Sequence, residues 1–304
     1  MKKTILFTGG SGLLAINWAV EIARDFDVVL VLHKRNISVP GVRTITFDME
    51  DAAALLTTLK TIQPDCVIHC AGLTSVEACE AQPELAYHVN VELSVNTAIV
   101  CKQLGIQYVY ISTDHLFSGN KPLVTEDDSP GPVNQYGKTK LEAEKRVLDI
   151  SETFLAIRTN FYGWGPVYRR SFSDMIIDNL GNGKPVTLFE DFFYTPILIE
   201  ELSQTVMALL EKKAQGVFHV VGDERISKLE FGMRVATRFG FDKKLIQVAR
   251  FSDRKDLVRR PHDLSLSNKK VSAFLGKNIG DVNANIEQLY AQKENGILKE
   301  IQSI

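Results

Sequence analysis

The sequence predicts an α/β protein built on a doubly wound parallel sheet, followed by a smaller mixed α/β lobe. Two observations predict this class. In the first half of the chain, short runs of continuous apolar residues alternate with longer helical patterns. A glycine-rich turn, Thr8–Gly12, directly follows the first of these runs. Apolar runs without alternation are typical of parallel strands covered on both faces, and right-handed connections between them place helices on both sides of the sheet.

The first elements open this sheet. Thr4–Thr8 is expected to be a strand, and Gly12–Arg24 a helix, because its apolar residues recur at helical spacing. Val28–Leu32 and Thr44–Phe47 are short runs rich in β-branched or apolar residues, so each predicts a strand. Ala52–Lys60 then predicts a second helix.

The next elements continue the alternation. Cys66–Cys70 lacks polar alternation, which indicates a buried strand. Pro83 suits the first position of a helix, and Leu85–Leu104 continues that helix to Gly105, a typical helix end. The remaining elements of this half are a strand at Tyr108–Ser112, a helix at Gln135–Asp149 and a sixth strand at Phe154–Arg158.

Beyond about residue 160 the alternation loosens. Glycine and proline interrupt Gly163–Pro166 and Gly181–Pro185, and helical patterns follow at Glu200–Lys212 and Lys228–Phe239. We expect this half to form a lobe over the carboxyl ends of the strands, where doubly wound sheets bind ligands.

Composition excludes several classes of protein. The net charge is -2, so no basic field predicts binding to nucleic acid or to an anionic membrane. No apolar stretch is long enough to cross a bilayer, and Met1–Lys3 leads directly into a short strand without a signal-peptide pattern. The four cysteines lack paired CxxC spacing, which favours reduced, mostly buried thiols. We therefore expect a cytoplasmic protein.

The glycine turn predicts a dinucleotide site of the Rossmann type. Gly9 permits the tight turn and Gly12 lets the backbone approach a pyrophosphate, with Ser11 and Leu13 beside them. The helix that follows offers backbone N–H donors and a partial positive charge. Ala15 stands where a third glycine is common, and alanine is small enough for the same packing.

The end of the second strand favours NADPH over NADH. An acidic residue usually binds both ribose hydroxyls of NAD there, whereas this chain has Lys34 and Arg35, which could pair with a 2′-phosphate. A solvated basic turn is the alternative. Asp48, beside Met49, follows the third strand and is either an adenine contact or a helix cap. Small residues after the fourth strand would pass close to the cofactor, namely Cys70, Ala71 and Gly72.

Tyr136 and Lys140 form a Tyr-x-x-x-Lys pair one helical turn apart. A lysine cation and a positive nicotinamide would lower the tyrosine pKa and make the phenol a proton donor to a carbonyl. Thr113, or less favourably Ser112, would hydrogen-bond and orient the same oxygen. This set, together with the glycine turn, predicts hydride transfer to or from a carbonyl.

These motifs resemble the extended short-chain dehydrogenase/reductase family. Within it, the sequence is similar to the dTDP-4-dehydrorhamnose reductase group over nearly the whole chain, most densely from residue 60 to 165. The likeness rests on Thr8–Gly12, Pro64–Gly72, Ser112–Gly119, Asn134–Lys140, Arg158–Gly163, Gly216–His219 and Arg260–Leu266.

The resemblance implies a catalytic set of Thr113, Tyr136 and Lys140, with Asn90 supporting the lysine through a water. It also implies a nucleotide-linked 4-keto-6-deoxyhexose as the substrate, and the family commonly forms dimers. The expected domains are an NADP-binding Rossmann domain at 1–160 with about 193–222, and a substrate-binding lobe at 161–192 and 223–304.

The substrate side is less distinct. His115 and Leu116 replace a Tyr-Val that is common in the group, beside the catalytic threonine. Arg169 and Arg170 are either diphosphate contacts or a solvated loop. No cluster of His, Cys and carboxylates has metal spacing, so the chemistry is expected to be metal-free. The expected substrate contacts are Thr74, Asp114, His115, Asn160, Trp164 and Arg260.

The sequence therefore predicts an NADPH-dependent reductase of a nucleotide-linked 4-keto-6-deoxysugar. A nucleotide-sugar epimerase or dehydratase that retains its cofactor is a second interpretation, although Asp114-His115 lacks the Asp-Glu pair common in dehydratases. A third is a non-catalytic NADP-binding subunit, because the similar proteins include a regulatory subunit of methionine adenosyltransferase.

Overall fold

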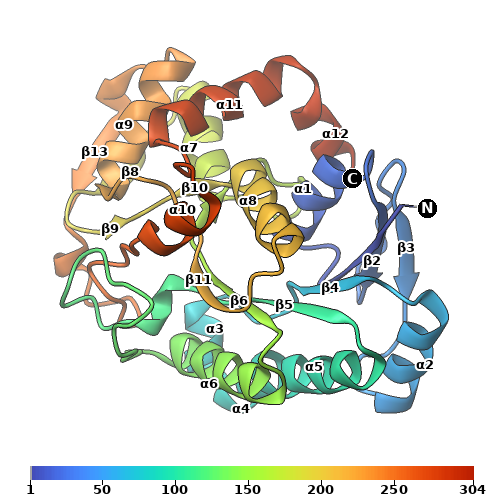
Figure 1. Cartoon of the computed structure of the whole chain (residues 1–304). Helices are drawn as coiled ribbons and strands as arrows, with labels where there is room; N and C mark the ends of the chain where they lie inside the picture. Colours follow the sequence, from blue (N-terminus) through green and yellow to red (C-terminus); the bar gives the residue numbers. More distant parts are fainter. Residues whose placement is uncertain (1) are drawn as a thin grey trace.

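A seven-stranded parallel sheet forms the centre of the computed structural model, which describes residues 2–304. Its strand order is β11-β6-β5-β4-β1-β2-β3, so the order reverses beside β1 as in a doubly wound sheet (Figure 1). The strands are β1 (Thr4–Thr8), β2 (Asp27–Leu32), β3 (Arg43–Thr46), β4 (Cys66–His69), β5 (Gln107–Ile111), β6 (Leu155–Arg158) and β11 (Gly216–His219).

Helices cover both faces of this sheet. On one face, α2 (Ala52–Ile62), α5 (Leu93–Leu104) and α6 (Gln135–Ile150) pack side by side. On the other, α1 (Leu13–Ile22) packs against α8 (Ile199–Glu211), as Figure 1 shows above the sheet. The predicted fold class is therefore confirmed, and the six strands predicted in the first half lie within a residue or so of their expected bounds.

The predicted long helix after Pro83 is interrupted. It consists of α4 (Pro83–Tyr87), a π-helical turn η1 (His88–Glu92) and α5. Gly105 ends α5 in the left-handed conformation, with φ of 69°. A short helix that the sequence did not predict, α3 (Val76–Ala81), precedes α4.

The rest of the chain forms small two-stranded sheets and helices. The pairs are β10 (Ile197–Leu198) with β7 (Phe161–Tyr162), β12 (Ile226–Ser227) with β9 (Phe193–Tyr194), and β13 (Ile246–Ala249) with β8 (Val186–Phe189). The helices are α7 (Phe172–Gly181), α9 (Lys228–Phe239), α10 (Lys269–Leu275), α11 (Val282–Glu294) and α12 (Ile297–Ser303), with 3₁₀ turns η2 (Asp114–Leu116), η3 (Lys243–Leu245) and η4 (Phe251–Asp253). The domain boundaries stay a prediction.

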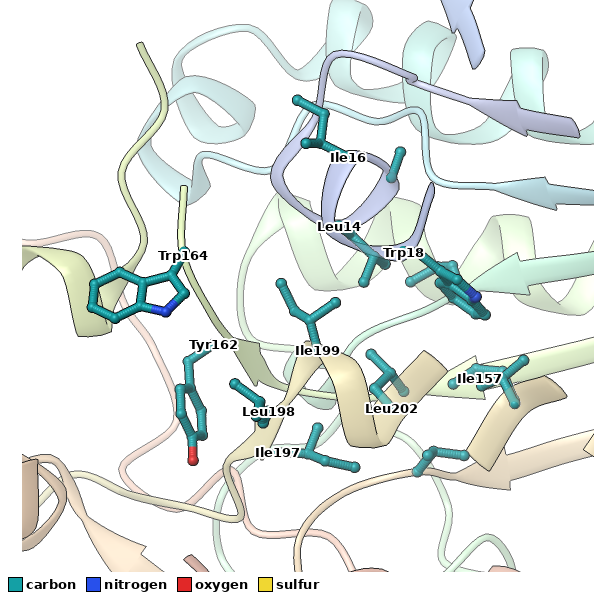
Figure 2. Packing of buried hydrophobic residues seen from close by; sticks show 14 of the residues in the cluster. Leu14, Ile16, Trp18, Ile157, Tyr162, Trp164, Ile197, Leu198, Ile199 and Leu202 are labelled. Carbon is teal, nitrogen blue, oxygen red and sulfur yellow. The ribbon is translucent and has the colours of Figure 1, made fainter. Parts of the chain in front are cut away.

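One continuous apolar cluster joins the sheet to this second region. Leu14, Ile16 and Trp18 of α1 meet Ile199 and Leu202 of α8 (Figure 2). Tyr162 and Trp164, which follow β6 in the chain, close the same cluster at its edge (Figure 2). The second region is thus packed firmly onto the face of the sheet that carries the glycine turn.

Within residues 2–304, none of the helices combines the length and apolar character that a membrane span requires.

Candidate active site

A cavity of about 610 Å³ runs along the carboxyl ends of β1 to β5. Ligands bind at this edge in doubly wound sheets. Residues of five strand ends and of α6 line it, and those predicted as site residues are Gly9, Ser11, Gly12, Leu13, Asp48, Met49, Cys70, Ala71, Gly72, Thr74, Tyr136 and Lys140. Residues from Gly9 to Arg170, far apart in the sequence, therefore meet at one site.

The glycine turn has the form of a phosphate cradle. Gly9 has φ of 65°, and a Cβ there would lie 2.8 Å from the Ala71 backbone, so only glycine fits. Gly12 N donates to Gly9 O at 2.8 Å and closes the turn. Gly12 is also the N-cap of α1, and no side chain in the described chain caps that helix. The first N–H groups of α1 are thus available to an anion in the cavity.

The end of β2 bears the predicted basic residues. His33 of this turn lines the cavity, while the neighbouring Lys34 and Arg35 are exposed. The Arg35 guanidinium lies 3.9 Å from the centre of the Tyr168 ring. Asp48 accepts a hydrogen bond from Glu50 N at 2.9 Å, whereas the N-cap of α2 is Asp51. The helix-cap alternative for Asp48 is therefore wrong.

A buried polar network supports the turn after β4. Asn90, in the π-helical turn, accepts from Leu73 N at 2.7 Å and donates to Leu73 O and to Thr139 Oγ1, both at 3.1 Å. A Cβ on Gly72 would lie 3.1 Å from Asn90 Oδ1. Asn90 therefore holds the 72–73 backbone against α6.

His69, the last residue of β4, belongs to the same buried network. Its Nδ1 lies 3.1 Å from Thr8 Oγ1 and its Nε2 lies 3.0 Å from Ser94 Oγ. Burial lowers the pKa of His69 to about 3, so the ring is neutral. Thr8 Oγ1 in turn accepts from Ala71 N at 3.2 Å, which ties the ends of β1 and β4 together.

The first turns of α6 position the tyrosine and the lysine. Asn134 caps the helix by accepting from Gly137 N at 2.9 Å. A Cβ on Gly137 would lie 2.4 Å from His115 O, so glycine lets α6 pack directly on η2. Lys140 is 6% exposed and donates to Ile111 O at 2.7 Å, with Nζ 4.1 Å from the Tyr110 ring centre.

The charge states at this end differ from the expectation. Desolvation raises the pKa of Tyr136 to about 12, and a hydrogen bond with the Thr113 hydroxyl opposes that rise. We expected the Lys140 cation to lower this pKa, but burial lowers the pKa of Lys140 itself to about 7. The phenol is therefore protonated at neutral pH.

Both candidate hydroxyls lie at the end of β5. Thr113 Oγ1 donates to Asp114 Oδ1 at 3.2 Å and accepts from His115 N at 3.3 Å. Ser112 lines the cavity, and its Oγ is buried without a hydrogen-bond partner among residues 2–304. Ser112 thus has a free hydroxyl on the cavity wall, whereas Thr113 is not among the cavity-lining residues and its hydroxyl acts on Tyr136 by opposing the rise of the phenol pKa.

Asp114, His115 and Asn160 form a cluster beside Tyr136, and none of them is among the residues that line the cavity. Asp114 is 2% exposed and accepts a short hydrogen bond from Asn160 Nδ2, and burial raises the pKa of its carboxyl to about 6. The His115 ring packs edge-on against Tyr136 with centres 5.5 Å apart. Burial lowers the pKa of His115 to about 3, so this side chain is neutral.

Two further predicted substrate contacts, Trp164 and Arg260, also lie outside the cavity lining. Trp164 is 1% exposed, and its indole N–H donates to Leu289 O at 3.1 Å inside the core (Figure 2). The aromatic side chain that lines the cavity is Phe161, three residues earlier. Arg260 forms an ion pair with Glu77 and is not among the cavity-lining residues. The tryptophan prediction is wrong because glycine neighbours do not distinguish a pocket aromatic from a core one.

Lys228, the first residue of α9, was not predicted as a site residue from the sequence. Its Nζ lies 3.5 Å from the Tyr194 ring centre and 4.2 Å from that of Phe172. Burial lowers the pKa of Lys228 to about 7, while the Asp114 carboxylate opposes this shift. A cation in the first turn of a helix is unfavourable with respect to the helix dipole. This unusual position is the sequence feature that could have pointed to Lys228.

The arrangement combines an anion cradle, a protonated phenol and the Ser112 hydroxyl along a single cavity. Such a set can bind a dinucleotide and donate a proton to a carbonyl oxygen beside it. No cluster of three or more His, Cys, Asp or Glu side chains suited to a metal occurs among residues 2–304.

Solved structures share this fold. An NADP complex of dTDP-4-dehydrorhamnose reductase from Bacillus anthracis superposes with a TM-score of 0.85 at 21% identity, over 96% of this chain and all (100%) of that one. A hypothetical dTDP-4-dehydrorhamnose reductase from Sulfolobus tokodaii gives a TM-score of 0.80 at 29% identity, over 92% of this chain and 98% of that one.

Relatives and a family model agree on descent. A probable low-salt glycan biosynthesis reductase of Haloferax volcanii is 31% identical over 237 residues, which are 75% of this chain and 78% of that protein. Methionine adenosyltransferase 2 subunit beta of Xenopus laevis is 32% identical over 245 residues, 78% of this chain and 72% of that protein. The model of the RmlD substrate binding domain matches residues 1–295. The chain therefore belongs to the RmlD family of extended short-chain dehydrogenases/reductases.

Proposed function

We propose that this protein is an NADPH-dependent reductase of a nucleotide-linked 4-keto-6-deoxysugar. The observation that carries the proposal is the position of Tyr136: it lines the same cavity as the glycine turn, and the Thr113 side chain opposes the rise of its pKa. The NADP complex of the Bacillus anthracis reductase and the reductase of Haloferax volcanii support it, because both are similar to this chain.

The residues present fit a dinucleotide. Gly9 and Gly12 leave room for a pyrophosphate against the open N-terminus of α1, and Cys70 to Gly72 form a wall without bulky side chains. Asp48 and Met49 line the adenine end, and Lys34 and Arg35 supply positive charge next to it. When bound, NADPH supplies a hydride.

Tyr136 is the proton donor in this proposal. Its pKa of about 12 keeps the phenol protonated at neutral pH, so the proton is available when a carbonyl oxygen gains negative charge. Thr113, with Ser112 beside it, orients that oxygen. Lys140 lies one turn below and stabilises the phenolate once the proton has left, and Asn90 keeps its helix in register with the 72–73 backbone.

In this scheme the sugar lies beside the phenol. Asp114 and Asn160 offer hydrogen-bonding groups next to it, the His115 ring packs against Tyr136, and Thr74 lines the cavity. Arg260 is a diphosphate contact in this scheme once it exchanges its partner Glu77 for the ligand.

A screen of keto-sugar nucleotides that follows NADPH oxidation by absorbance tests the function. At least one compound should be reduced with one NADPH consumed per product. Tyr136→Phe should lower kcat about 100-fold or more while NADPH binding stays nearly unchanged. Tyr290→Phe on α11, distant from the cavity, is the matched control and should leave kcat unchanged. Wild-type kcat in the Tyr136→Phe variant would contradict the proposal.

A regulatory subunit is the second candidate function, because a methionine adenosyltransferase 2 subunit beta covers 78% of the chain. NADPH binding without consumption, together with co-purification of a methionine adenosyltransferase, would favour it. An epimerase that retains its cofactor would convert the sugar without net NADPH oxidation. Analysis of the sugar product therefore separates it from a regulatory subunit, and NADPH consumption separates the reductase from both.

A further inference from the structure

Residues 163–171, which we name the crossing loop, connect β7 to α7 across the mouth of the cavity. The loop is pinned at both ends. Asn17 Nδ2 of α1 donates to Trp164 O at 2.7 Å, and Asp174 accepts from Gly165 N and Ser171 N, both at 2.8 Å. A Cβ on Gly165 would lie 2.2 Å from Arg169 O, so the two arms of the loop touch at this point. This is a tightly constrained loop.

Its tip contacts both sides of the cavity. The Tyr168 hydroxyl donates to Ser11 O at 3.1 Å, on the glycine turn. The next residue, Arg169, donates to Thr74 Oγ1 at 3.0 Å, beyond the end of β4. Both Ser11 and Thr74 line the cavity, so the loop spans from the pyrophosphate cradle to the opposite wall.

Arg35 comes from the third side, at the end of β2, and its guanidinium lies 3.9 Å from the centre of the Tyr168 ring. This is the stacking distance of a cation–π contact. An exposed arginine otherwise samples many rotamers, and fixing it on binding loses conformational entropy. A ring that already holds the guanidinium removes part of that loss. The hydrogen bond of Tyr168 to Ser11 O fixes the ring relative to the turn that would hold the pyrophosphate.

We propose that Tyr168 is a specificity-determining residue for the dinucleotide: its ring holds Arg35 where the guanidinium receives the 2′-phosphate of NADPH. Arginine binds phosphate bidentately and stacks on aromatic faces, so one guanidinium can do both. NADH lacks that phosphate, so holding Arg35 on the Tyr168 ring does not increase the affinity for NADH. The inference shares its dinucleotide with the proposed function but depends on no sugar substrate.

The test measures dissociation constants for NADPH and for NADH with the full chain, by fluorescence or calorimetry, in the absence of sugar. The wild-type chain should prefer NADPH by about 10-fold or more. Tyr168→Phe keeps the ring and loses only the hydroxyl, so both cofactors weaken equally and the preference stays. Tyr168→Leu removes the ring and should lower the preference about threefold, the factor of an exposed cation–π contact.

A double-variant cycle shows whether the effect passes through Arg35. Arg35→Gln should remove most of the preference, and Arg35→Gln with Tyr168→Leu should have the same preference as Arg35→Gln alone. Lys34→Gln is the matched control: it removes a neighbouring cation, and its effect should add to that of Tyr168→Leu. Thermal unfolding of each variant verifies that the chain is folded.

Three results would overturn the inference. The first is a folded Tyr168→Leu variant with wild-type preference, and the second is a full additive loss in the double variant. The third is a wild-type chain that binds both cofactors equally. None of these depends on which sugar is reduced, so failure here is distinct from failure of the reductase assay.

Discussion

The cofactor side and the substrate side of the candidate site are built by different physical means. The cofactor side consists of backbone in close contact: Gly9 against Ala71, Gly72 against Asn90, and the uncapped start of α1. The substrate side, beside Tyr136 and outside the cavity lining, contains buried ionisable groups such as Asp114. The cofactor side is held by packing and hydrogen bonds, whereas the substrate side includes groups whose burial opposes their charged forms.

The two sides therefore contribute differently to stability and to selectivity. The close backbone contacts of the cofactor side stabilise the fold and shape the dinucleotide site, so those positions accept only glycine. Buried charges without a direct ion pair destabilise the fold and persist where function requires them. Substitutions on the two sides should therefore change the free energy of unfolding in opposite directions.

Gly9→Ala should have the largest effect on stability. The added methyl group would lie 2.8 Å from the Ala71 backbone at φ of 65°. We expect the free energy of unfolding to fall by about 2–4 kcal/mol and NADPH binding to be lost. Urea unfolding and cofactor fluorescence measure both. Gly41→Ala is the control, because φ is 72° there and the added Cβ meets no described atom within 4 Å; it should cost about 1 kcal/mol. Equal effects of the two variants would contradict the close-contact account.

Asp114→Asn should have an intermediate effect of opposite sign. The carboxyl pKa is about 6 in the folded chain against an ordinary value of 3.8, so folded chains hold a proton that unfolded chains lose. Wild-type stability thus falls as pH rises from about 4 to 6. The variant escapes this loss and should be more stable than wild type by about 1–3 kcal/mol at pH 7, with little difference near pH 3.5.

Thermal unfolding across that pH range measures the Asp114 effect, and turnover of the variant should fall at the same time. Asp25→Asn, at an exposed site, is the control and should show no such pH-dependent gain. If Asp114→Asn were less stable than wild type at pH 7, the hydrogen bonds of the Asp114 carboxylate would outweigh its desolvation, and the prediction would be wrong.

Thr74→Val should have the smallest effect. It removes the hydroxyl that accepts from Arg169 and keeps the side-chain volume. Hydrogen bonds at exposed sites contribute about 1 kcal/mol or less, so the dissociation constant for NADPH should change less than about fivefold. A change of 10-fold or more in NADPH affinity, measured by calorimetry, would place Thr74 in direct contact with the cofactor.

The cofactor half could be predicted in detail because its signals are local. Continuous apolar runs predict buried parallel strands, and the glycine turn and the Tyr136–Lys140 spacing each lie within one short segment. The substrate side could not be predicted in the same way, because its contacts are between residues that are far apart in the sequence. Lys228 meets aromatic rings from α7 and β9, and Tyr168 reaches Ser11, 157 residues away.

Side-chain direction was the other limit. Phe161 and Trp164 are both aromatic residues after β6, yet only the first lines the cavity. Composition alone does not state which way a loop residue points. The Tyr136 pKa shows the same limit, since the sequence indicates a neighbouring lysine but not the desolvation that outweighs it.

The wide turn at His88–Glu92 has a consequence for how this chain could vary. Such a turn contains one residue more than an α-helical turn, so the helices before and after it are out of phase by one position. Deleting a single residue there would restore one uninterrupted helix and rotate the Asn90 amide away from Leu73 and Thr139. Loss of that amide in a homologue would then be recorded as a gap in the alignment rather than as a substitution.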